Sequence, residues 1–63
     1  MIPKDPMLLL SYVNTQLRDF YPDLESLCAD KNIPKAEVEE KLQGIDYTYD
    51  KTLNRFVSRQ THE

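Results

Sequence analysis

The chain has 63 residues, 40% of them hydrophobic, with eight Lys plus Arg against eleven Asp plus Glu and a formal net charge of −3. Area scaling gives about 6,500 Å² removed from water on folding, which suffices for one compact core and excludes a core plus a large buried pocket. The single cysteine, Cys28, excludes an intrachain disulfide, and no apolar run is longer than Met7–Leu10, which excludes a membrane span. Prolines at positions 3 and 6 interrupt any secretory signal, so we expect a cytoplasmic protein with no membrane contact.

A helix over about residues 6–20 is the first predicted element. Asp5 can cap it, and Pro6 takes the first helical position, where an amide hydrogen would lack a partner anyway. Apolar residues then recur at three- and four-residue spacing, as a buried helical stripe requires. They are Leu9, Leu10, Val13, Leu17, Phe20 and Tyr21. Pro22 ends the helix because it disfavours helical backbone at the residue before it.

Two shorter helices are predicted over about residues 23–31 and 34–43. Their inward-facing apolar positions are Leu24, Leu27 and Cys28 in the first, and Val38 and Leu42 in the second. Asn32 tolerates the left-handed conformation that ends many helices, so it marks the end of the first. Gly44 is the only glycine in the chain, and we expect it to terminate the second.

A two-stranded hairpin is predicted over about residues 46–58, with a tail over residues 59–63. Asp50 and Asn54 favour a turn between an alternating run and a β-prone run. An isolated ribbon of two strands is unstable in water. One face of the hairpin, formed by Tyr47 or Tyr49 with Phe56, must therefore pack on the helices.

This order of elements predicts one α+β, mainly helical domain over residues 1–63, similar to a helix-turn-helix with a short wing, that is, winged-helix-like. Residues 24–42 read Leu-x-x-Leu-Cys-x-x-x-Asn-Ile-x-x-x-x-Val-x-x-x-Leu, which resembles the pattern of many helix-turn-helix units. A small residue at Cys28 allows close helix crossing, and Ile33 fills the angle between the two helices. The pattern indicates a fold more than a function.

Short runs in both halves of the chain carry a second resemblance. They are Met1–Pro6, Leu9–Ser11, Val13–Asn14, Leu17–Asp19, Ile45–Tyr47, Tyr49–Asp50 and Asn54–Val57. In these runs the chain resembles a family of short, about sixty-residue bacterial proteins catalogued only as a domain of unknown function. The resemblance implies a bacterial origin and a stand-alone protein, and it brings no activity and no site residues.

The residues with catalytic or metal-binding chemistry form no plausible site. The only histidine, His62, lies in the predicted tail, where a general base has no fixed geometry. Cys28 falls on the inner face of its helix as a structural thiol, and one Cys with one His cannot build a zinc site. Asp46, Asp50 and Asn54 lack the distal bidentate Glu of a calcium loop, so we interpret the last two as turn caps. We expect no enzyme, no cofactor, no metal and no small-molecule substrate.

Four residues of the first helix are candidates for contact with a protein partner. Asn14 and Arg18 lie one turn apart beside the apolar stripe. A polar Asn there needs a hydrogen bond, so it either bonds backbone groups of the hairpin or recognises a partner. Leu8 and Tyr12 fall off the stripe and form an apolar ridge, which is either covered by the hairpin or open to a second copy or another protein.

Nucleic-acid binding is the competing hypothesis, because a helix-turn-helix places its third helix in the major groove. The outer face of that helix carries Lys35 and Gln43 together with Glu39 and Glu40, two carboxylates that would face phosphate. The predicted wing adds Lys51, Arg55 and Arg59. The sequence therefore favours a non-catalytic protein-interaction or accessory regulatory module, possessing a partner or forming a homodimer through the first helix, with a winged-helix-like DNA-binding protein as the alternative.

Overall fold

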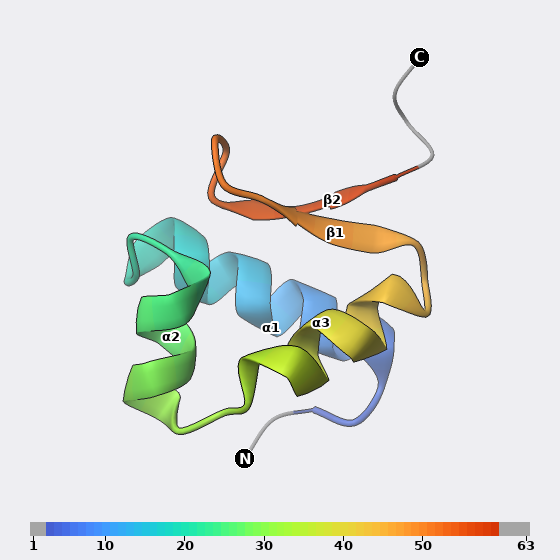
Figure 1. Cartoon of the computed structure of the whole chain (residues 1–63), viewed down its shortest axis with the longest axis horizontal. Coiled ribbons are helices and arrows are strands. Elements are labelled where there is room, and N and C mark those ends of the chain that lie inside the picture. The colour runs from blue at the N-terminus through green and yellow to red at the C-terminus, as the bar shows by residue number, and fades with distance from the viewer. Residues whose placement is uncertain (1–2, 60–63) are drawn as a thin grey trace.

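The computed structural model describes residues 3–59 as three helices beneath a two-stranded hairpin (Figure 1). The helices are α1 (Pro6–Asp19), α2 (Leu24–Lys31) and α3 (Lys35–Gln43), and the strands are β1 (Tyr47–Asp50) and β2 (Arg55–Ser58). The predicted α+β, mainly helical fold is confirmed, and each predicted helix lies within one residue of its expected bounds. Residues 60–63 of the predicted tail, His62 among them, lie outside the described residues.

Side chains and left-handed residues define the ends of the helices. The Asp5 carboxylate accepts the amide of Met7 at 2.8 Å at the start of α1, as the sequence predicts. Asn32 ends α2 with a φ of 59°. Gly44 follows α3 at the predicted place but is right-handed, with a φ of −62°. The chain instead continues through two more short turns before Asp46 takes the left-handed conformation, with a φ of 66°.

The core is formed by nine buried side chains from all three helices and β2. They are Leu9, Val13, Leu17, Leu24, Leu27, Cys28, Val38, Leu42 and Phe56. The predicted stripe of α1 is wrong at its end, because Phe20 is 69% exposed. Phe20 is the C-cap, with a φ of −130°, so its side chain leaves the helical stripe. Leu10 and Tyr21 are only partly buried and pack against the core.

The hairpin packs on the helices through the face that the sequence predicts. Tyr49 pairs with Phe56 across the strands. The centroids of their rings are 5.5 Å apart, and the ring planes are inclined at 52° to each other. Phe56 is buried, while Tyr47 and Tyr49 are half-buried against the core. The Asp50 carboxylate accepts the amides of the next loop residues, Thr52 and Leu53, at 2.9 and 3.1 Å. Its predicted role as a turn cap is therefore confirmed.

Candidate functional site

Asn14 joins α1 to the hairpin. Its side-chain oxygen accepts the amide of Phe56 at 2.8 Å, and its side-chain nitrogen donates to the Phe56 carbonyl at 3.2 Å. The Asn14 side chain thus forms hydrogen bonds with both the N–H and the C=O of Phe56, as the backbone of a neighbouring strand would. Of the two explanations that the sequence left open for Asn14, the hydrogen bond to the hairpin is confirmed.

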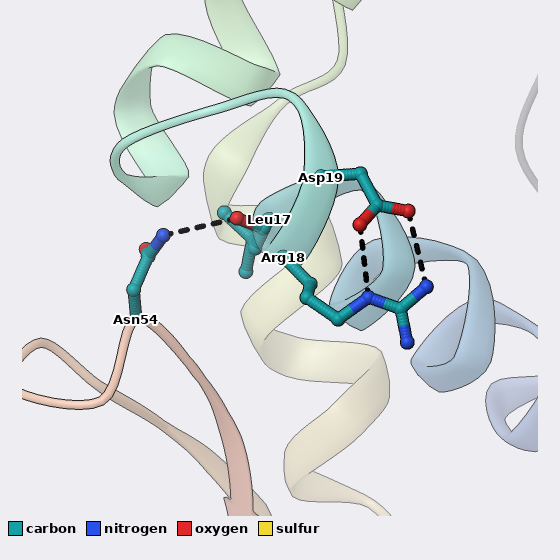
Figure 2. A network of polar contacts seen from close by, with 4 residues as sticks. All are labelled: Leu17, Arg18, Asp19 and Asn54. Atoms are coloured by element: carbon teal, nitrogen blue, oxygen red, sulfur yellow. Dashed lines mark hydrogen bonds and ion pairs between the residues drawn. The ribbon is translucent and has the colours of Figure 1, made fainter.

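Asn54 joins the hairpin loop to the end of α1. Its side-chain nitrogen donates to the carbonyls of Leu17, at 3.2 Å, and Tyr21, at 3.0 Å (the first contact is drawn in Figure 2). Carbonyls at the end of a helix lack partners within it. The Tyr49 hydroxyl donates to Asn54 Oδ1 at 2.6 Å and accepts the amide of Leu24 at 3.2 Å. These contacts hold α1, α2 and the hairpin together through two side chains, of which the sequence had identified Asn54 only as a turn former.

Arg18 lies on the exposed side of α1 and binds its neighbour. Its Nε and Nη2 donate to the two carboxylate oxygens of Asp19 at 2.9 and 3.0 Å, as Figure 2 shows. The side chains are 75% and 41% exposed. Hydrogen bonding to the guanidinium lowers the pKa of Asp19 below its usual range. The third nitrogen, Nη1, does not contact Asp19 and remains available as a donor.

A surface hollow lies between α1 and the hairpin loop, and we call it the arginine hollow. It is lined by Ser11, Asn14, Thr15, Leu17, Arg18, Leu53, Asn54 and Arg55. The structure thus brings the predicted pair Asn14 and Arg18 together with Arg55, which the sequence had assigned to the wing. The charged residues of this lining are the two arginines, and no Asp or Glu belongs to it.

A second hollow lies between the start of α2, α3 and β1, and we call it the acidic hollow. Its charged lining residues are three carboxylates, Asp23, Glu25 and Glu39, and two lysines, Lys35 and Lys51. Lys35 Nζ already lies 3.4 Å from Glu25. The Ser26 amide binds the Asp23 carboxylate at 2.7 Å and lowers its pKa. Three carboxylates against two lysines give the lining of this hollow a net negative charge.

The four basic residues predicted for nucleic-acid contact do not lie in one place. Lys35 and Lys51 line the acidic hollow, and Arg55 lines the arginine hollow. Arg59 is exposed just after β2, where its backbone amide donates to the Asp46 carbonyl at 2.8 Å. Although Lys51 and Arg55 are close in sequence, they line different hollows.

The predicted apolar ridge on α1 is exposed at one residue and partly buried at the other. Leu8 is 61% exposed, so the alternative in which the hairpin covers it is wrong. Met7, its neighbour in sequence, is 56% exposed. Tyr12 is half-buried and packs against the core. The exposed apolar surface at the start of α1 therefore consists of Met7 and Leu8, and Tyr12 lies one turn after Leu8.

Two further titratable groups have shifted pKa values. The Tyr21 hydroxyl donates to Asp30, and this hydrogen bond raises the pKa of Tyr21 to about 12. Cys28 is 6% exposed, and burial raises the pKa of its thiol. Within residues 3–59, no three His, Cys, Asp or Glu side chains gather closely enough to hold a metal ion. Among the same residues, no helix combines the length and the apolar character needed to cross a membrane.

Comparison with known proteins gives one match. The family model described as "Domain of unknown function (DUF4250)" matches residues 3–56. No curated protein and no solved structure matches the chain. The helix-turn-helix with a wing therefore stays an interpretation of the order of elements, and the bacterial origin stays a prediction.

Proposed function

The chain belongs to the family described as Domain of unknown function (DUF4250), and we propose that it is a non-catalytic protein-interaction module of the cytoplasm. One observation carries this proposal: Met7 and Leu8 are 56% and 61% exposed at consecutive positions of α1. The inner stripe of the same helix, Leu9, Val13 and Leu17, is already completely buried in the core. The exposed pair is therefore not needed to complete the fold.

A second copy of the chain is the partner that this surface fits best. Isolated exposed leucines are ordinary, but here Met7 and Leu8 are both exposed on the first turn of α1, and Tyr12 follows Leu8 one turn later. Burying a leucine side chain contributes about 1.5–3 kcal/mol, and a two-fold pairing buries it in both copies. Because α1 is already folded and packed, the contact costs little ordering entropy.

The residues with nucleophilic chemistry support a non-catalytic role. The Cys28 thiol is 6% exposed, and its raised pKa keeps it protonated at neutral pH. A thiolate, rather than a thiol, is the reactive nucleophile. Cys28 thus fits a structural position between helices, as the sequence predicted.

DNA binding is the second candidate, supported by three exposed basic residues on and after the hairpin: Lys51, Arg55 and Arg59. The acidic hollow argues against it. Three carboxylates line the hollow beside two lysines, and Glu37 and Glu40 of α3 are exposed as well. Non-specific affinity for DNA comes from neutralisation of its phosphates by basic side chains. The carboxylates of the acidic hollow and of α3 would instead repel the phosphates.

Sedimentation equilibrium over a range of concentrations tests the proposal. We expect the wild type to form dimers, Leu8→Glu to stay monomeric, and both to give the same helical circular dichroism. Leu53→Glu is the matched control, because Leu53 is a leucine of similar exposure, 55%, in the hairpin loop. It should dimerise like the wild type. A wild type that stays monomeric up to about 1 mM, where even weak association is visible, contradicts the proposal.

A further inference from the structure

We infer that the arginine hollow between α1 and the hairpin loop binds the carboxylate groups of an acidic peptide segment. Arg18 supplies one guanidinium from α1, and Arg55 supplies another from the first residue of β2. Ser11 and Thr15 add hydroxyl groups from the same helix. No carboxylate lines this hollow, although the chain as a whole carries a net charge of −3.

The two guanidinium groups have donors to spare. Within residues 3–59, the Arg55 side chain has neither an ion pair nor a hydrogen bond. Its cross-strand neighbour Asp50 directs a carboxylate oxygen to the amides of Thr52 and Leu53 instead. A guanidinium presents five N–H groups in a planar fork, which matches a carboxylate in two-point fashion. Arg55 is thus a cation open to an incoming anion.

The pair between Arg18 and Asp19 does not close the hollow. Only Nε and Nη2 of Arg18 contact Asp19, so the other edge of the guanidinium can donate to a second carboxylate. The Arg18 side chain is 75% exposed, and exposed ion pairs are weak enough to exchange. Counting Arg18, Arg55 and Asp19 together leaves one net positive charge at this place.

The elements that carry the arginines are fixed to one another. Asn14, in the lining, holds β2 to α1 through both backbone groups of Phe56. Asn54, also in the lining, holds the loop to the end of α1 at Leu17. The backbone positions of Arg18 and Arg55 are therefore fixed relative to each other, which lowers the entropy cost of binding.

The surroundings of the hollow favour a peptide over a nucleic acid. Leu53 lines the hollow and is 55% exposed, so it offers an apolar contact beside the arginines. A short segment that alternates carboxylates with an apolar side chain needs only this surface. A nucleic acid extends further, and the carboxylates of the acidic hollow, at the start of α2 and in α3, would repel its phosphates.

Amide chemical shifts in NMR titrations test the site. The probe is an acetylated and amidated peptide, Glu-Glu-Leu-Glu-Glu-Leu, and the control peptide replaces every Glu with Gln. We expect the acidic peptide to shift the amide signals of Ser11, Thr15, Arg18 and Arg55, and the Gln peptide to leave them unchanged. Each of Arg18→Gln and Arg55→Gln should weaken binding about fivefold to tenfold, which corresponds to one lost charge-assisted hydrogen bond. Lys51→Gln, the matched control in the acidic hollow, should change it less than about twofold.

Three outcomes would overturn the inference. The first is the absence of shifts around the hollow at about 5 mM peptide, a concentration that reveals millimolar affinity. The second is equal weakening by Lys51→Gln and Arg55→Gln, which would indicate attraction to overall charge. The third is tighter binding of a random-sequence single-stranded oligonucleotide to the same residues, which would identify a phosphate site. Because Arg18 and Arg55 are exposed, the spectra of the free variants should retain the folded dispersion, which verifies that binding, rather than folding, is measured.

Discussion

The arginine hollow and the acidic hollow both adjoin the hairpin, but their polar residues have different structural roles. In the arginine hollow, Asn14 and Asn54 hold the hairpin to α1, and Arg18 and Arg55 are the charged residues of the lining. In the acidic hollow, Lys35 and Glu25 form an ion pair that is exposed to solvent. Part-buried amides therefore hold the elements together on one side, whereas solvated charges set only the surface potential on the other.

The largest expected effect comes from Asn54→Ala. The substitution removes the donors to Leu17 and Tyr21 and the acceptor of the Tyr49 hydroxyl. It also places alanine at a φ of 55°, where a side chain without a local hydrogen bond is disfavoured. We expect the free energy of unfolding in urea to fall by about 3 kcal/mol.

Asn54→Gly separates the two causes of that loss. Glycine adopts a positive φ without strain, so this variant should lose about 2 kcal/mol, for the hydrogen bonds alone. Equal stability of Asn54→Gly and the wild type would show that the contacts at the end of α1 contribute nothing.

The next largest effect is expected for Asn14→Ala. It leaves the amide and carbonyl of Phe56 without their partner, so the free energy of unfolding should fall by about 2 kcal/mol. Thr15→Ala is the control at the exposed neighbouring position, and it should change stability by less than about 0.5 kcal/mol. Similar values for the two variants would mean that the hairpin is held by apolar packing alone.

A smaller effect concerns alkaline pH. Tyr21 donates to Asp30, and its pKa rises from 10.0 to about 12. Because this folded-state pKa exceeds the unfolded value, the stabilising contribution is complete below pH 10 and is lost as the pH rises toward 12. Spectrophotometric titration of tyrosinate should show a late step that Tyr21→Phe removes and that Asp30→Asn moves toward pH 10. A late step that survives Tyr21→Phe would assign it to another tyrosine.

The smallest effect is expected in the acidic hollow. Lys35→Gln removes a contact of 3.4 Å between side chains that are 42% and 80% exposed. Urea unfolding should change by less than about 0.5 kcal/mol, because solvent screens such pairs. A loss above about 1 kcal/mol would show that the charges of this hollow are structural, and the contrast with Asn54 would fail.

The elements and most of the core could be predicted because their causes are local. The Asp5–Pro6 start, the spacing of Leu9 and Val13, and the left-handed Asn32 act within one or two turns of chain. The hydrogen-bond need of Asn14 was also visible, since a polar side chain beside a buried stripe requires a partner.

The rest depends on how the elements dock. Asn54 donates to the carbonyl of Leu17 in the last turn of α1, 37 residues earlier in the chain, and no spacing rule reaches that far. Lys51 and Arg55 line different hollows because one side of the hairpin lies next to α2 and α3 and the other side lies next to α1. Phe20 continues the apolar spacing of α1 but lies at the point where the helix unwinds. These features follow from tertiary packing, which periodicity alone does not encode.

The most direct test of the contrast between a protein-binding and a nucleic-acid-binding surface is fluorescence anisotropy of a labelled random-sequence DNA duplex at low salt. Even sequence-specific proteins show a salt-dependent non-specific mode, so no operator needs to be known. Because three carboxylates line the acidic hollow together with Lys35 and Lys51, we predict no binding at about 100 μM protein. Binding in the micromolar range that weakens as salt rises would contradict this prediction and favour the winged-helix-like DNA-binding alternative.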